Sequence, residues 1–434
     1  MQSSQLSESR SNENPPAVAG AGRQLVLAGA FLGWMFAGVQ MGIMPLVARA
    51  VSQDLIGAQF NERIAGQWFA WYTVAFLLGA AIGGMLLGWM GDRRGRTRAM
   101  GWSIVCYSVF CGAGYFVKSQ EQLIVLRFLS SLGVGGMWPN GVSLISEFWP
   151  DVSRPMLAGL MGAAANIGVL LTGLIGSALD VTPTSWRWIM LVGAAPGLLG
   201  VVALTIVPES PQWLAAGVSS PSGRRETPVL EVFRPPLLRV TLVGICLGTV
   251  PLLGGWGSGK FLIPWADALS GTSNPGYKAA TQIIWAAGAA LGAFFGGRLA
   301  HALGRRFSYF LTSLVSLVVN GGIFRFVNPL QSLFLPSVFV LGFVSTIFFG
   351  WLPLYLPELF PTRVRATGTG VAYNFGRFAS AAGVLGAGAL VNLFDGDYAK
   401  VGAVTSLIYA VGMVVIWWAP DTTGQNLRRQ QQNL

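Results

Sequence analysis

Two cationic side chains lie inside long apolar runs of this chain, where ionisable groups are costly and therefore candidates for function. Arg377 lies about eleven residues into the run 366–392, and Asn374 precedes it by one helical turn on the same face. Lys260 follows a glycine-rich break in another run. A guanidinium can bind a carboxylate in bidentate geometry. These residues predict an anion site, although Arg377 could instead pair with a helix end and Lys260 could lie near the outer mouth.

The elements that must position these cations are membrane helices. The chain has 434 residues, of which 53% are hydrophobic and only 10% are charged. A soluble domain carries roughly 25% charged residues. Runs of about 20 apolar residues span a bilayer as helices. We predict an all-α polytopic membrane protein with twelve spans near 24–48, 67–90, 99–117, 122–147, 155–179, 187–207, 239–265, 279–301, 306–327, 332–356, 366–392 and 399–419.

Neutral polar and aromatic side chains inside these spans are further candidates for a central site. Amides could bind a polar ligand or join helices, and tryptophans could stack on a ligand or belong to the interfacial belts. The candidates are Gln40, Asn166, Gln282, Trp138, Trp285 and Trp351.

A short basic loop and its weaker copy indicate a duplicated chain. The loop 88–98 reads GWMGDRRGRTR, and the segment 297–306 reads GRLAHALGRR, with Gly304 placed 209 residues after Gly95. One loop repeated at half-chain spacing predicts two pseudo-symmetric six-helix bundles.

The basic residues also predict the topology. Most arginines fall in alternate short loops, and the positive-inside rule then places both termini in the cytoplasm of a cell whose inner or plasma membrane holds the chain. The longest inner loop divides the spans into six and six. The expected parts are a disordered N-terminus over 1–22, bundles over 23–207 and 239–419, a linker over 208–238 and a tail over 420–434.

Several other classes of function are excluded by composition. The basic excess of 28 over 17 lies in loops between spans, so it predicts no nucleic acid partner. Three cysteines in apolar runs predict no disulfide framework, and one histidine gives no metal cluster. The glycine-rich stretches follow no strand, so they are not phosphate loops. We therefore predict no cofactor and no enzymatic activity.

Five motifs in order resemble the major facilitator superfamily. They are the loop 88–98, its copy at 297–306, the segment 127–136 (RFLSSLGVGG), the end of the first half at 208–214 (PESPQWL) and the segment 357–368 (PELFPTRVRATG). The resemblance covers nearly the whole chain. It implies a secondary transporter that works by alternating access, acts as a monomer in the lipid bilayer, and binds a small-molecule substrate. The pattern is most similar to sugar porters and to proton symporters of metabolites such as sialic acid, lactate and aromatic acids.

The resemblance also implies gating and coupling residues. Asp92 with Arg93 and Arg96 would close the inner gate in the outward-open state, or would only set topology by charge. The other residues that could gate or couple are Arg127, Glu147, Arg154, Asp267, His301, Arg305, Glu358 and Arg363.

One departure bears on energy coupling. Relatives often carry aspartates in the first helix at positions that read Ala37 and Gln40 here. The expected function is transport of a small organic anion, sugar or sugar acid, with a co-transported proton as a possible partner. The alternatives are a facilitator or exchanger without proton coupling, an efflux transporter, and a membrane sensor that transports nothing.

Overall fold

A computed structural model describes residues 20–149, 154–211, 213–214, 229–274, 276–361 and 364–422. The described residues form helices and turns, with no strand among them. Most of the expected N-terminal segment and tail and about half of the expected linker lie outside the described residues, as do Arg363 and the side chain of Arg154. The prediction of an all-α membrane protein is confirmed, because ten described helical segments are long and apolar enough to cross a membrane.

The twelve predicted spans correspond to helices that often extend a few residues beyond the prediction. Two further helices that match predicted spans, α5 and α16, lie outside these ten segments, and they carry Arg127 and Arg377. The helices are α2 (Gly20–Ile56), α3 (Glu62–Arg94), α4 (Arg96–Ala113), α5 (Gln120–Phe148), α6 (Arg154–Ala178), α7 (Trp188–Ala194), α8 (Gly197–Ile206), α10 (Leu237–Gly257), α11 (Leu262–Ser270), α12 (Tyr277–Leu303), α13 (Arg305–Phe326), α14 (Phe334–Thr346), α15 (Leu352–Glu358), α16 (Arg365–Leu393), α17 (Tyr398–Thr405) and α18 (Ile408–Val415).

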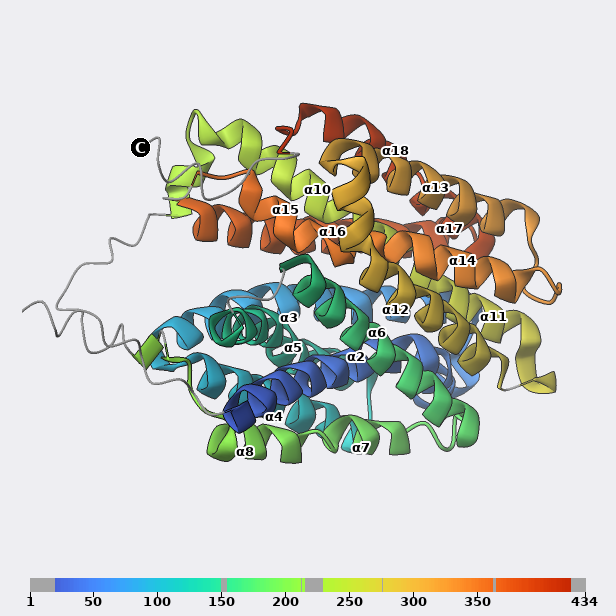
Figure 1. The fold of residues 1–434 in the computed structure, drawn as a ribbon. Coiled ribbons are helices and arrows are strands. Elements are labelled where there is room, and N and C mark those ends of the chain that lie inside the picture. The colour runs from blue at the N-terminus through green and yellow to red at the C-terminus, as the bar shows by residue number, and fades with distance from the viewer. Residues whose placement is uncertain are drawn as a thin grey trace, which may run out of the picture.

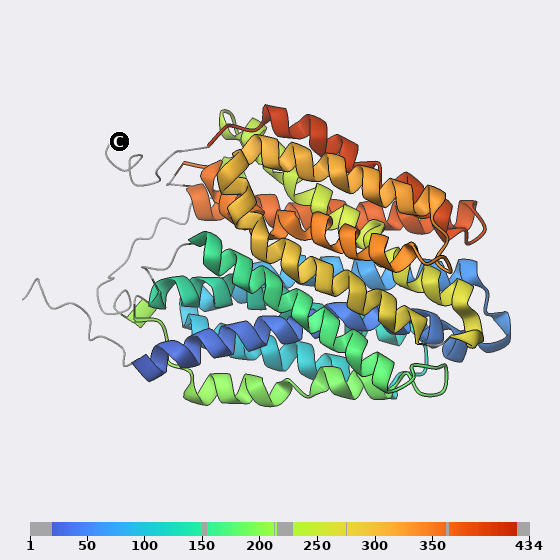
Figure 2. The same ribbon diagram turned by 45° about the vertical axis from the view of Figure 1, so that its right-hand side comes forward.

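These helices gather into two bundles that lie side by side along their length. Figure 1 shows α2–α8 in the lower part and α10–α18 mainly in the upper part, with α11 and the end of α12 reaching down beside α6, and Figure 2 shows the two bundles lying against each other. The bundles, called here the first and second halves, meet chiefly where α6 packs on α12 and where α3 packs on α16. Small residues permit this approach, since a Cβ on Gly159 of α6 would lie 2.9 Å from the carbonyl oxygen of Phe294 in α12.

Two helices of the second half are interrupted by short 3₁₀ turns, and one of these interruptions contains Lys260. The helix α10 ends at Gly257, one turn of 3₁₀ helix (η4, Gly259–Phe261) follows, and α11 begins at Leu262. Likewise α14 gives way to a 3₁₀ turn (η6, Ile347–Gly350) before α15. Irregular backbone at membrane depth is tolerated where protein or a cavity surrounds it. Lys260 lies in the first of these breaks.

The two copies of the basic loop have the same local structure. Gly95 precedes α4 with a φ of 111°, and Gly304 precedes α13 with a φ of 80°. Glycine adopts such positive φ values without the steric cost of a Cβ atom. Because these glycines are 209 residues apart, the structural match supports the duplication inferred from sequence. The end of the molecule that holds both loops is called the basic end below.

Close helix packing in the first half gives a testable consequence. A methyl group on Gly83 of α3 would overlap the carbonyl oxygen of Leu132 in α5, whereas one on exposed Gly386 of α16 would meet nothing within 4 Å. Overpacking costs about 1–3 kcal/mol, and glycine-to-alanine changes in open helix positions are neutral or favourable. We expect Gly83→Ala to lower the Tm of the detergent-purified protein. A Tm equal to that of the matched control Gly386→Ala would contradict the packing described here.

Candidate functional site

A cavity of about 120 Å³ lies between the two halves. Its lining is mostly aromatic and aliphatic, with a few polar groups, as is usual for small-molecule sites. The first half contributes Trp34, Met41, Phe76, Leu77, Trp138, Gly162, Asn166 and Val169, and the second half contributes Leu252, Gly255, Trp256, Lys260, Trp285, Ser345, Thr346, Phe349, Pro353, Tyr373 and Arg377.

Lys260 is the cation with the fewest partners in this cavity. Its side chain is only 4% exposed, and its Nζ makes no hydrogen bond within the described part of the chain. The amine lies 3.7 Å from the centroid of Trp285 and 5.9 Å from that of Trp256. Ring faces attract a cation but do not replace a hydrogen-bond acceptor. The amine is therefore positioned to bind an acceptor that comes from a ligand.

Two indole groups add to the unsatisfied donors around the cavity. Trp34 and Trp285 both line it, and neither Nε1 has a hydrogen-bond partner in the described structure. An ammonium and two indole N–H groups can only donate. Buried polar groups are normally paired, so three unpaired donors at one cavity indicate a ligand that carries acceptors.

Arg377 also lines the cavity, but part of its guanidinium is already engaged. Its Nη1 donates to the carbonyl oxygen of Ala80 at 2.8 Å and to Oδ1 of Asn374 at 3.2 Å, and its guanidinium lies 4.8 Å from the centroid of Tyr373. Ala80 belongs to α3, so this bond joins the two halves. The expected contact between Arg377 and Asn374 is present, and Arg377 also acts as a link across the cavity.

The flat walls of the cavity come from aromatic side chains of both halves. Trp34 and Trp138 have ring centroids 5.0 Å apart, and Phe76 of α3 packs against Trp256 of α10 at 4.5 Å. Trp285, Phe349 and Tyr373 complete a set of seven aromatic residues in the lining. Such a set suits a planar, apolar body whose polar group points to Lys260.

The structure brings together some of the predicted site residues and separates others. Arg377, Lys260, Trp138, Asn166 and Trp285 line the cavity, with Asn374 beside Arg377. Three others lie outside the lining. Gln40 donates to the carbonyl oxygen of Gly193 at 2.7 Å, Gln282 donates to that of Val169 at 3.2 Å, and Trp351 is fully buried against Tyr309 and Tyr355.

Trp34, Trp256 and Phe76 also line the cavity, although they are not among the residues predicted from the sequence. Trp256 lies four residues before Lys260, directly ahead of the glycine-rich break, so this spacing was the available signal. No comparable spacing identifies Trp34 or Phe76. They reach the cavity because α2 and α3 pack against the second half.

Arg127 lies apart from this cavity. It is 5% exposed, its Nη1 donates to the carbonyl oxygen of Gln40 at 2.7 Å, and its guanidinium lies 5.0 Å from the centroid of Phe76. Ala37 and Gln40, at the positions where relatives often carry acids, are both fully buried. The resemblance implied a carboxylate on α2 at Ala37 or Gln40. In this structure the backbone carbonyl of Gln40 accepts the hydrogen bond from Arg127.

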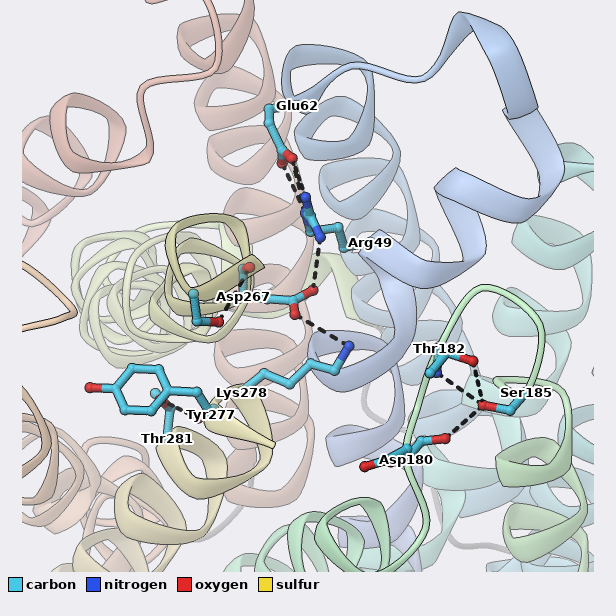
Figure 3. Close-up of polar contacts among 10 residues, drawn as sticks. Arg49, Glu62, Asp180, Thr182, Ser185, Asp267, Tyr277, Lys278 and Thr281 are labelled. Carbon is cyan, nitrogen blue, oxygen red and sulfur yellow. Dashed lines mark hydrogen bonds and ion pairs between the residues drawn. The ribbon is translucent and has the colours of Figure 1, made fainter. Parts of the chain in front are cut away.

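Four charged residues join the halves at the end opposite the basic loops. Figure 3 shows Arg49 of α2 between Glu62 of α3 and Asp267 of α11. Arg49 Nη2 lies 2.7 Å from Glu62 Oε1, and its Nη1 lies 3.7 Å from Asp267 Oδ2. Lys278 of α12 approaches the other Asp267 oxygen at 3.3 Å. This set, called the cross-half cluster below, contains one predicted site residue, Asp267.

Each half has its own ion pair at the basic end. Arg96, at the start of α4, lies 2.5 Å from Asp92 and 3.7 Å from Glu147 at the end of α5. Arg305, at the start of α13, contacts Glu358 at the end of α15 at 3.0 Å. These pairs lie within one half, whereas the predicted latch would have to act between halves.

Two further predicted gating residues lie on the surface of this end. The guanidinium of Arg93 lies 4.5 Å from the centroid of Trp89. His301, which takes the place of Asp92 in the second copy, is exposed in the last turn of α12. The role of all these residues in gating stays a prediction.

The arrangement of two helix bundles around a central cavity agrees with a known family. A model of the Major Facilitator Superfamily matches residues 26–384. This chain belongs to the Major Facilitator Superfamily. The resemblance inferred from the motifs is therefore confirmed.

Known members of the superfamily show how far the similarity extends. The cis,cis-muconate transport protein of Acinetobacter baylyi is 29% identical over 77% of this chain and 81% of its own length. The sialic acid transporter NanX of Escherichia coli is 26% identical over 89% of each chain. The structure of the xylose transporter XylE from E. coli matches with a TM-score of 0.73 at 18% identity, over 94% of this chain and 100% of that one. The chain is accordingly a membrane transporter of metabolites and not an enzyme.

Proposed function

We propose that this protein carries a small planar organic anion across the membrane. The observation that carries the proposal is Lys260, a buried amine without an acceptor in a cavity whose described lining includes no aspartate or glutamate. A buried charge is normally paired, and a carboxylate of the substrate would supply the missing partner. Arg377 would add positive potential from the same cavity.

The size and walls of the cavity favour a compact, flat substrate. Drug-sized ligands occupy pockets of roughly 300–1,000 Å³, and this cavity measures about 120 Å³. A sugar acid presents many hydroxyl groups that need hydrogen-bond partners. Here most of the wall is aromatic or aliphatic, which suits an unsaturated or aromatic carboxylate better. The muconate carrier among the relatives is named for a substrate of this kind.

Alternating access would use the two halves as the moving bodies. We propose that residues 23–207 and 239–419 rock about the cavity, with both termini in the cytoplasm of the cell and the chain acting as a monomer. In that orientation the cross-half cluster lies on the outer side, and the Arg49–Asp267 pair holds this side closed. Breaking this pair would accompany the change to an outward-open state.

Uptake into proteoliposomes would test the proposed substrate class. The substrates to compare are benzoate, cis,cis-muconate, sialic acid and xylose, each labelled and used at the same concentration. We expect uptake of benzoate or cis,cis-muconate well above that of empty liposomes, and of xylose at background. Uptake of xylose or sialic acid with no uptake of the two planar anions would overturn the proposal in favour of a sugar or sugar-acid carrier.

A further inference from the structure

We infer that Lys260 carries a proton that moves together with the anion. Its amine gains the proton as the carboxylate docks and returns it to water as the carboxylate leaves. This inference rests on the proposed function, because it takes the same cavity as the anion site. It assigns energy coupling to the second half of the chain, whereas the resemblance pointed to acids in the first helix.

The amine of Lys260 lies in apolar surroundings. Lys260 is 4% exposed and has ring faces on two sides, from Trp285 and Trp256, with no hydrogen-bond acceptor in the described structure. A charged amine buried without a counter-ion is unfavourable, and a bound carboxylate removes that cost. The charge on the amine and the anion are therefore coupled.

The described elements that neighbour Lys260 offer no better proton site. The titratable groups facing the cavity beside Lys260 are Tyr373 and Arg377 of α16. Arginine stays protonated in proteins and so cannot cycle. Asp267, on the adjacent α11, forms ion pairs with Lys278 and Arg49 in the cross-half cluster.

The remaining charged or titratable neighbours are also engaged elsewhere. Tyr398 of α17 contacts the ring of Phe261 next to Lys260, with the ring centroids 6.2 Å apart. Arg127 of α5 donates to the carbonyl oxygen of Gln40. Lys260 is thus the described cavity group that can exchange a proton and lacks a partner.

Coupling between the proton on Lys260 and the bound anion has a consequence for transport. Binding linkage is reciprocal, so if the proton strengthens anion binding, the anion strengthens proton binding by the same factor. One proton and one monocarboxylate would cross together, with no net charge moved. An inward proton gradient would then drive anion uptake although the first helix has no acid at Ala37 or Gln40.

The experiment measures proton uptake when benzoate binds to the purified full-length protein. Calorimetric titration in buffers of different ionisation enthalpy gives the number of protons taken up per benzoate between pH 7 and pH 9. We expect up to about one proton in the wild type, with affinity falling as the pH rises, by as much as about tenfold per pH unit. Lys260→Arg keeps a permanent charge, so it should bind benzoate without taking up a proton. Lys400→Arg, at an exposed lysine paired with Asp397, is the matched control and should behave as the wild type.

The outcomes distinguish a failure of the proton coupling at Lys260 from a failure of the anion site itself. Proton uptake that persists in Lys260→Arg would overturn the role of Lys260. If that variant does not bind, Lys260→Gln decides: weak binding that is independent of pH supports the inference, and an unchanged pH slope overturns it. A wild type that binds benzoate with no proton exchange would overturn the coupling alone. A wild type that binds neither benzoate nor cis,cis-muconate would overturn the anion site as well.

Discussion

Replacing Lys260 by methionine should weaken benzoate binding roughly thirtyfold. A hydrogen bond to a charged group contributes about 2 kcal/mol, which corresponds to a factor of about 30 in Kd. Methionine keeps much of the length and apolar volume of the side chain, so the aromatic walls formed by Trp256 and Trp285 should stay in place. Quenching of tryptophan fluorescence on titration with benzoate would report the change, because four tryptophans line the cavity.

The control for this prediction is a lysine outside the cavity. Lys400→Met removes an exposed amine that pairs with Asp397 at 3.1 Å and should leave benzoate affinity within twofold of the wild type. Equal affinity in Lys260→Met and the wild type would mean that the amine does not bind the carboxylate. Arg377 would then be the next residue to substitute.

Replacing Asp267 by asparagine should shift the protein toward a state open at the cross-half cluster. Asp267 and Lys278 are each only 5% exposed, and Arg49 depends on Asp267 for its contact with the second half. Removing one partner of a buried pair costs about 3–5 kcal/mol, since the remaining charges stay buried. The Lys278–Asp267 pair lies within the second half, so only the part of this cost that comes from losing the Arg49–Asp267 contact falls on the closed state alone. Spin labels at Gln59 and Ser273, in a background without the three native cysteines, would report a longer distance by electron–electron double resonance.

An exposed pair at the same end is the matched control. Asp395 contacts Arg63 across the halves at 3.9 Å, but its side chain is 90% exposed. Exposed ion pairs contribute about 0–1 kcal/mol, so Asp395→Asn should change the distance distribution little. If Asp267→Asn also leaves the distribution unchanged, the cross-half cluster does not stabilise the closed state.

Much of the fold could be predicted from the sequence, because membrane helices are recognised by the length and composition of their apolar runs. Every predicted span matches a helix or a broken pair of helices, and the repeat of Gly95 at Gly304 predicted matching turns that the structure contains. Differences arise at helix ends. The helix α2 continues to Ile56 rather than ending near 48, because Ala50 and Val51 lie in a core of buried residues to which both halves contribute.

The candidate site was only partly predictable for a physical reason. Lys260 and Arg377 could be found because a charge in an apolar run is costly wherever the run packs. Trp34 and Phe76 could not be distinguished from many other aromatic residues, since their place in the cavity depends on how the two halves meet. The same holds for Arg49, whose position near the end of a helix indicated only topology. Its partner Asp267 is more than 200 residues away.

The most direct test of the anion site is a structure of the protein with 4-bromobenzoate bound. We expect anomalous bromine signal among the aromatic residues of the cavity, with the carboxylate at hydrogen-bond distance from Lys260 Nζ. The signal should vanish from this place in crystals of Lys260→Met. A carboxylate that lies away from Lys260, or a ligand bound outside the cavity, would contradict the account.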